Sequence, residues 1–209
     1  MRLKICGLRE KENIERISAM RPHYIGLIFY KRSPRYAGDR LRPEHLDSVQ
    51  GTTGKVGVFV NERVKVVIET VTRYGLDAVQ LHGDETPGYC SDLKDKGIEV
   101  IKAFYPDSDN DFKRIKDYNA VCDYFLFDSR GRGRGGSGKK FNWDILSKYD
   151  LEKQYFLSGG IGPHDAETIR QISDKYLYAI DINSRFEKEP GLKDVNLISE
   201  FINKLGIRQ

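Results

Sequence analysis

The chain has 209 residues, 39% of them hydrophobic, and is therefore long enough to bury one core as a single domain over residues 1–209. Its formal charge of +4 mildly favours anionic ligands but does not by itself separate a phosphorylated metabolite from a nucleic acid. Its apolar runs are far shorter than the roughly 20 residues of a membrane-spanning helix, so we expect no contact with a membrane core.

Eight short apolar runs along the chain are typical of buried β-strands. They are Leu3–Cys6, Tyr24–Phe29, Val56–Val60, Ala78–Leu81, Val100–Ala103, Tyr124–Phe127, Tyr155–Leu157 and Tyr178–Ile182. Apolar residues at helical spacing lie between several of them, as at Ile14 and Ile17, although the second and fifth helices are weakly patterned. Strands that alternate with helices in this way predict an α/β fold, a single-domain eight-stranded parallel β/α (TIM) barrel.

An open, doubly wound sheet is the alternative to a closed barrel. A dinucleotide-binding sheet of that kind normally carries a GxGxxG turn after its first strand. Here the first strand is followed by Cys6-Gly7-Leu8-Arg9 instead. We therefore favour the closed barrel.

Residues able to carry chemistry directly follow these strands, at positions where the loops of a barrel build one active site. Cys6 ends the first strand, and its alternative role is that of a small buried side chain. Asp128 follows the sixth strand and could be a general acid, an N-cap or a partner of Arg130. Arg35, in a proline-stiffened loop, has the planar fork that suits a carboxylate, although a lone arginine is usually a solvated surface residue.

The three cysteines are widely separated and lack CxxC spacing, which indicates neither a disulfide framework nor a metal site. A cytoplasmic location fits best. His82, after the fourth strand, could be a second acid–base group or could simply line the site.

Two adjacent strand ends predict a phosphate site. Gly159 and Gly160 follow the seventh strand, and Asn183 and Ser184 follow the eighth. This is the place where barrels commonly bind phosphate through backbone N–H groups, and glycines allow the anion to approach closely. A flexible turn without a ligand is the alternative.

One segment, Ser129–Lys140, departs from the average composition with five glycines and five basic residues. Arg-Gly repeats also occur in segments that bind RNA. Because this segment follows a strand and lacks interleaved aromatic residues, we favour a gating loop over an active site and expect no nucleic-acid partner.

Taken together, these segments resemble the phosphoribosylanthranilate isomerase family. The matching stretches occur in the family's order: Lys4–Leu8, Gly26–Tyr30, Ser33–Tyr36, Val56–Asn61, Val79–Glu85, Phe127–Asp128, Gly135–Trp143, Gly159–Ile161 and Asp181–Asp194. The resemblance implies an Amadori rearrangement of N-(5'-phosphoribosyl)anthranilate in tryptophan biosynthesis, without a cofactor.

The same resemblance implies a role for each site residue. Asp128 would be the general acid and Cys6 the general base, with Lys4 or Arg35 favouring the thiolate. Arg35 would hold the anthranilate carboxylate. The remaining substrate contacts would come from Gln80, His82 and Asp181, and the phosphate contacts from Gly159, Gly160, Asn183 and Ser184.

The chain departs from the family pattern at three positions: Lys31 replaces a common proline, Ser129 replaces a frequent threonine, and Arg185 stands where a glycine is expected. If that backbone needs a positive φ, Arg185 would cost on the order of 1 kcal/mol, yet it could also contact phosphate. A related isomerase of the histidine pathway, a dual-substrate enzyme, an RNA-binding protein and a catalytically silent barrel remain as alternatives. Cys6 argues against the histidine-pathway enzyme, which generally uses paired aspartates. We expect a monomer or a homodimer.

Overall fold

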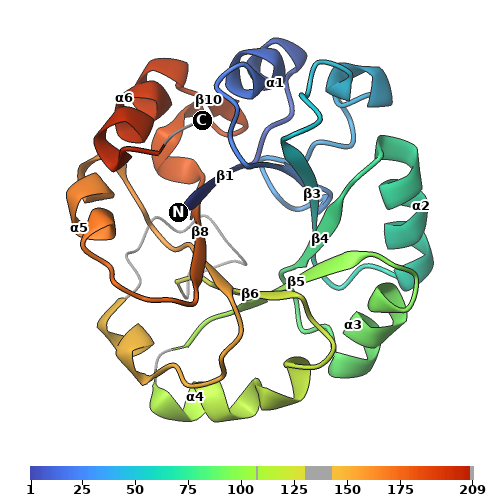
Figure 1. Ribbon diagram of the computed structural model, residues 1–209. Helices are drawn as coiled ribbons and strands as arrows, with labels where there is room; N and C mark the ends of the chain where they lie inside the picture. The colour runs from blue at the N-terminus through green and yellow to red at the C-terminus, as the bar shows by residue number, and fades with distance from the viewer. Residues whose placement is uncertain (107, 130–142, 208–209) are drawn as a thin grey trace.

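A computed structural model describes residues 1–106, 108–129 and 143–207 of the chain, and its eight long-range strands close into a parallel barrel (Figure 1). The strands are β1 (Arg2–Cys6), β2 (Tyr24–Ile28), β3 (Gly54–Phe59), β4 (Ala78–Leu81), β5 (Glu99–Phe104), β6 (Tyr124–Phe127), β7 (Tyr155–Leu157) and β8 (Leu177–Ile182). All eight predicted strands are confirmed, and β4, β6 and β7 have the predicted bounds. The closed barrel, and not the open sheet, is therefore the fold.

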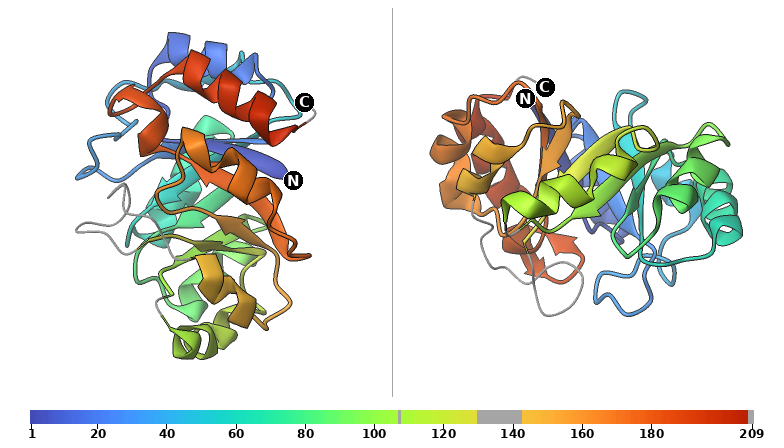
Figure 2. Two further views of the ribbon diagram at one scale, coloured as in Figure 1. Left: turned by 90° about the vertical axis from the view of Figure 1, so that its left-hand side faces the viewer. Right: turned by 90° about the horizontal axis from the view of Figure 1, so that it is seen from below.

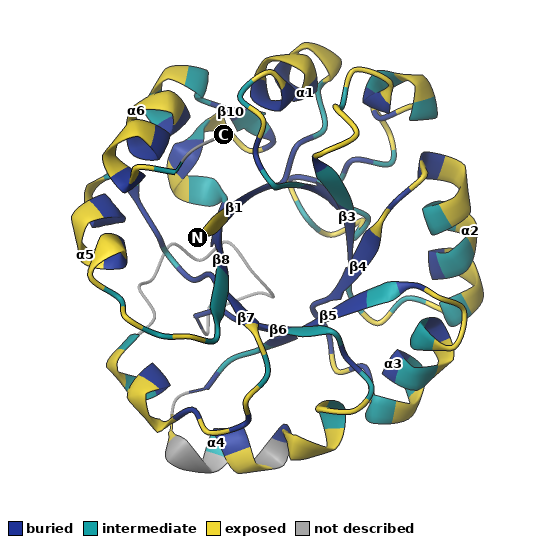
Figure 3. Ribbon diagram, viewed as in Figure 1, coloured by how far each residue is buried: buried dark blue, intermediate teal, exposed yellow. Residues whose placement is uncertain are grey.

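Helices surround the barrel and turn their exposed faces outward, with their buried residues toward the strands (Figure 3). They are α1 (Lys11–Ser18), α2 (Val64–Tyr74), α3 (Pro87–Lys94), α4 (Asp109–Arg114), α5 (Ala166–Arg170) and α6 (Val195–Leu205). Hydrogen bonds from backbone N–H groups to Thr86 and Asp194 cap the N-termini of α3 and α6. Within the described part of the chain, no helix has both the length and the apolar character needed to cross a membrane.

Short 3₁₀ segments complete the connections: η1 (Pro43–Leu46), η2 (Lys116–Tyr118), η3 (Trp143–Lys148), η4 (Pro163–Asp165) and η5 (Ser184–Phe186). Between β2 and β3, where the sequence showed only a weak helical pattern, η1 is the helical element that covers the barrel. Pro43 begins this segment because it lacks the N–H that a first helical turn leaves unpaired.

The barrel has an outer and an inner core. Alternate strand residues such as Leu3 and Ile5 pack outward against the helices. The inner residues at the amino-terminal end form a second apolar cluster: Val56, Ala78, Ile101, Ala103, Leu126, Phe156 and Ala179. Toward the carboxyl ends, buried polar side chains replace this packing, among them Lys4 and Gln80. The interior therefore changes from an apolar core to a polar site along the strands.

A short antiparallel hairpin, β9 (Glu187–Glu189) and β10 (Leu192–Lys193), follows β8 and was not predicted from the sequence. Gly191 turns it with a φ of 89°, a conformation that favours glycine. Figure 2 shows both chain ends on one side of the barrel and the segment after β2 extending on the other side. The hairpin brings the side chain of Lys193 into a fully buried position beside the site.

Candidate active site

A pocket with about 760 Å³ of empty space, including its open mouth, lies at the carboxyl ends of the strands. All ten predicted site residues line it: Cys6, Arg35, Gln80, His82, Asp128, Gly159, Gly160, Asp181, Asn183 and Ser184. They come from the strand ends because parallel strands in a barrel direct their carboxyl termini to one face. No group of three or more His, Cys, Asp or Glu side chains within residues 1–106, 108–129 and 143–207 could hold a metal ion.

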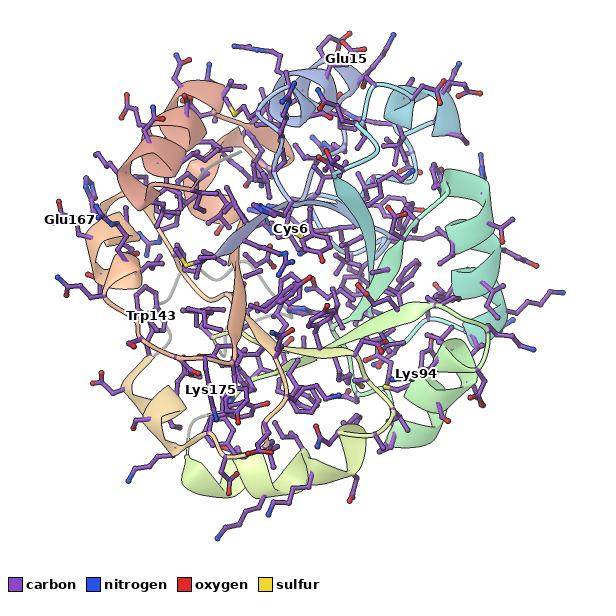
Figure 4. All side chains as sticks on the ribbon, in the orientation of Figure 1. Cys6, Glu15, Lys94, Trp143, Glu167 and Lys175 are labelled. Atoms are coloured by element: carbon purple, nitrogen blue, oxygen red, sulfur yellow. The ribbon has the colours of Figure 1, made fainter. Side chains whose placement is uncertain are left out.

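Cys6 lies inside the ring of strands, whereas Glu15, Lys94 and Glu167 project from the outer helices (Figure 4). Its side chain is only 3% exposed. A Cβ atom at Gly26 would lie 2.6 Å from the Cys6 sulfur, so glycine on the neighbouring strand makes room for the thiol. Burial raises the pKa of the Cys6 thiol, although the positive charges of Lys4 and Lys193 oppose this.

Lys4 shares an inward face with Cys6 because residues two apart on a strand point to the same side. It is fully buried, and its Nζ donates to Asp181 Oδ2 at 2.9 Å and to Gln80 Oε1 at 2.8 Å. Burial opposes its charge, but Asp181 and Cys6 outweigh burial and hold the pKa of Lys4 above its usual value. Lys4 therefore places a positive charge beneath the pocket.

His82 and Asp128 lie side by side in the pocket, with 3.3 Å between Nε2 of the histidine and Oδ2 of the aspartate. The other carboxylate oxygen, Oδ1, accepts a hydrogen bond from the backbone N–H of Ser129 at 2.7 Å. The Nδ1 atom of His82 lies 3.0 Å from the amide nitrogen of Gln80. One oxygen of the Asp128 carboxyl thus accepts a backbone hydrogen bond, and the other lies near a ring nitrogen that has no other partner among the described residues.

Arg35 lines the pocket, but its guanidinium is already paired. Its Nε and Nη2 form a two-pronged ion pair with Glu187, whose oxygens lie 2.7 to 2.9 Å away. Lys193 Nζ also contacts Glu187, at 2.7 Å. Burial opposes the charge of Glu187, yet Arg35 and Lys193 hold its pKa below the usual value. Burial likewise lowers the pKa of Lys193 to about 8.

The predicted phosphate loop has the backbone that close anion approach requires. Gly159 and Gly160 have φ values of 89° and 70°, which favour glycine. Lys193 Nζ donates to Asn183 Oδ1 at 2.6 Å. Arg185 does not adopt a positive φ, so it does not carry the backbone strain that a replaced glycine would cause there. Its aliphatic stem lies against Gly162, where a Cβ atom would come within 3.2 Å of Arg185 Cδ.

Glu187 and Lys193 were not predicted from the sequence as residues of the site. They were missed because they reach it through a hairpin whose strands are too short to be recognised. Lys4 was considered only for its charge, yet a lysine inside an otherwise apolar strand is itself a signal, because buried lysines are rare. The proposed gating loop, Ser129–Lys140, lies outside the described residues except for Ser129, and Arg130 lies outside them too.

Comparisons with known proteins show similarity along almost the whole chain. Residues 3–204 match the sequence model of the family described as N-(5'-phosphoribosyl)anthranilate (PRA) isomerase. The chain is 44% identical over 207 residues to the N-(5'-phosphoribosyl)anthranilate isomerase of Parabacteroides distasonis, which covers 98% of this chain and 93% of that one.

Solved structures show the same similarity. The phosphoribosylanthranilate isomerase of Thermotoga maritima is 31% identical, with a TM-score of 0.84 and coverage of 99% of this chain and 98% of that one. A phosphoribosylanthranilate isomerase in complex with reduced 1-(o-carboxyphenylamino)-1-deoxyribulose 5-phosphate is 29% identical, with a TM-score of 0.81 and the same coverage.

Proposed function

The chain belongs to the N-(5'-phosphoribosyl)anthranilate isomerase family, and on that basis we propose that it performs the family's Amadori rearrangement, with Asp128 as acid and Cys6 as base. The product would be 1-(2-carboxyphenylamino)-1-deoxyribulose 5-phosphate, an intermediate of tryptophan biosynthesis. The observation that carries the proposal is that Cys6 and Asp128, far apart in sequence, line one pocket. The rearrangement only moves protons and opens a ring, so an acid and a base suffice and no cofactor is required.

In the first step, Asp128 gives its proton to the furanose ring oxygen, and the bond between that oxygen and C1 breaks. The nitrogen lone pair forms the C1–N double bond of a Schiff base. Asp128 is left as a carboxylate, which the Ser129 N–H and the His82 ring are positioned to stabilise.

In the second step, Cys6 as thiolate removes the proton from C2, and the electron pair neutralises the Schiff base to give an enolamine. Tautomerisation then completes the rearrangement. Burial raises the pKa of the Cys6 thiol, and the charges of Lys4 and Lys193 act against burial and favour the thiolate.

Two anchors would align the sugar between acid and base. Arg35 uses Nε and Nη2 for Glu187, which leaves Nη1 for the anthranilate carboxylate. Backbone at Gly159 and Gly160, with Asn183 and Ser184, would hold the phosphate.

The substrate's hydroxyl groups have a suitable acceptor in the pocket. Asp181 Oδ1 is buried without a hydrogen-bond partner among the described residues, and Asp181 lines the pocket beside Gln80 and His82. An unpaired buried acceptor is costly, so a ligand hydroxyl that satisfies it gains affinity. We assign Asp181, with these two neighbours, to contacts with the ribose.

The test is a fluorescence assay that follows loss of freshly generated phosphoribosylanthranilate above its spontaneous breakdown. Cys6→Ser and Asp128→Asn should each abolish the catalysed loss while the protein stays folded. Cys90→Ser is the matched control, because Cys90 is a buried cysteine on α3 outside the pocket. Full activity in either site variant would refute its assigned role, and an inactive folded wild type would point to a changed substrate.

A further inference from the structure

A row of polar side chains runs from Lys4, beneath the pocket, through Gln80 and His82 to Asp128 in the pocket wall. Lys4 Nζ lies 2.8 Å from Gln80 Oε1, the amide nitrogen of Gln80 lies 3.0 Å from His82 Nδ1, and His82 Nε2 lies 3.3 Å from Asp128 Oδ2. Each of the four residues is at most 7% exposed. Because these residues are buried, the hydrogen-bonding state of each side chain is determined mainly by the side chains next to it.

The direction of every hydrogen bond in this row follows from Lys4. A lysine ammonium has only donors, so the group of Gln80 that faces it must be the amide oxygen. The NH₂ group of Gln80 then points to His82 Nδ1 and donates to it. An Nδ1 atom that accepts cannot carry a proton, so the ring proton of a neutral His82 must sit on Nε2, toward Asp128.

We propose that Lys4, acting through Gln80, fixes His82 as the neutral Nε2–H tautomer, so that His82 donates to the Asp128 carboxylate left after proton transfer. Gln80 is then a positioning residue, and His82 donates a hydrogen bond without giving its proton away. The inference deepens the proposed isomerase function and rests on it.

The charges around His82 do not all favour this state. Asp128 and Asp181 attract an imidazolium, whereas Lys4 repels it. A doubly protonated ring would also place its Nδ1 proton against the NH₂ group of Gln80. The ring of Tyr105 also packs against His82 at nearly a right angle, with 5.5 Å between the ring centroids, and it restricts the plane of the imidazole without adding a charge.

The Nε2 atom has no well-aligned hydrogen bond to any described residue, and its contact with Asp128 is long. Hydrogen bonds in an empty active site are often long and tighten only with the substrate in place. This geometry fits a donor that is needed most after the acid has given up its proton.

Nuclear magnetic resonance of protein labelled with ¹⁵N in its histidines tests the proposal without turnover. The chain has four histidines, and comparison with His82→Gln assigns the His82 signals. We expect a one-bond N–H coupling at Nε2 and an unprotonated Nδ1 at neutral pH. A proton on Nδ1, or on both nitrogens, would overturn the proposal.

Two variants of Gln80 test its positioning role. Gln80→Leu should release the tautomer preference and lower kcat/KM by about 10- to 100-fold, the effect of losing one hydrogen bond to a charged group. Gln80→Glu turns the donor into an acceptor and should protonate both ring nitrogens. Gln171→Leu, the same kind of change at an exposed residue, should alter neither signal.

The outcomes separate the two proposals. If Gln80→Leu leaves the His82 spectrum and kcat/KM at the level of Gln171→Leu, Gln80 does not position His82. If Gln80→Leu fails to fold, the wild-type spectrum and Gln80→Glu still decide. If His82 shows the expected tautomer but the protein has no isomerase activity, the hydrogen-bond network from Lys4 to Asp128 is supported and the proposed function is contradicted.

Discussion

Replacing Lys4 by methionine should destabilise the protein strongly and in a pH-dependent way. Lys4 and Asp181 form an ion pair with side chains 0% and 4% exposed, so methionine keeps the volume but leaves Asp181 as an unpaired buried charge. Removing one partner of a buried ion pair typically lowers the free energy of unfolding by about 3–5 kcal/mol. The structure offers Asp181 no other cation at hydrogen-bond distance among the described residues.

Protonation of Asp181 limits this cost. Each pH unit between the usual aspartate pKa of about 3.9 and the working pH contributes about 1.36 kcal/mol. The electrostatic loss is therefore capped at about 4 kcal/mol at pH 7 and about 1.5 kcal/mol at pH 5. Burial already raises the pKa of Asp181 in the wild type, and the loss of Lys4, which lowers it, raises it further. The folded variant therefore binds the extra proton more readily and regains stability as the pH falls.

Urea denaturation at pH 7 and pH 5 measures both losses. Lys4→Met combined with Asp181→Asn removes the charge and should lose only about 1–3 kcal/mol, the cost of unpaired neutral groups. Lys65→Met is the control, since Lys65 pairs with Glu69 on the surface, and should change stability by less than about 0.5 kcal/mol. A loss below 1 kcal/mol at pH 7, or an equal loss at both pH values, would refute the reasoning.

Three further predictions concern the pocket. Because burial raises the pKa of Cys6, its alkylation by iodoacetamide should accelerate with pH up to and beyond about 8.5; a rate that levels off below neutral pH would contradict this. Gly26→Ala should slow both turnover and Cys6 alkylation and cost about 1–3 kcal/mol, whereas Gly51→Ala, with open space around it, should do neither. Glu187→Gln should raise KM about tenfold with little change in kcat, since it loosens Arg35 at a substrate anchor; steady-state kinetics in which kcat falls instead would show that Glu187 acts on the chemical step.

The strands could be predicted because those of a parallel barrel are buried on both faces and appear as continuous apolar runs. Tyr124–Phe127 and Ala78–Leu81 are such runs, and their bounds agree with β6 and β4. The second crossover could not be predicted, because its helical element is a single 3₁₀ turn that Pro43 begins and that is too short for a periodic pattern.

The site was predictable in its positions but not in its pairing. The end of a strand places Cys6 and Asp128 at one face whatever the loops do, so strand prediction alone located them. The partner of Arg35 depends on the hairpin that carries Glu187, 152 residues further along the chain, and no local pattern reports such a contact. For the same reason, the order of contacts from Lys4 to Asp128 could not be predicted, since it links β1, β4 and the residue that follows β6.

The polar interior explains why these pairings matter beyond the chemistry. The amino-terminal half of the barrel is filled by aromatic and small apolar side chains, with the Tyr24 and Tyr178 hydroxyls joined at 2.8 Å. The carboxyl-terminal half holds the buried charges of Lys4 and Asp181, which form an ion pair. Such charges contribute little net stability, and removing one leaves its partner uncompensated. The apolar half and the outer core must therefore supply the stability that allows the other half to keep charges in fixed positions for a substrate.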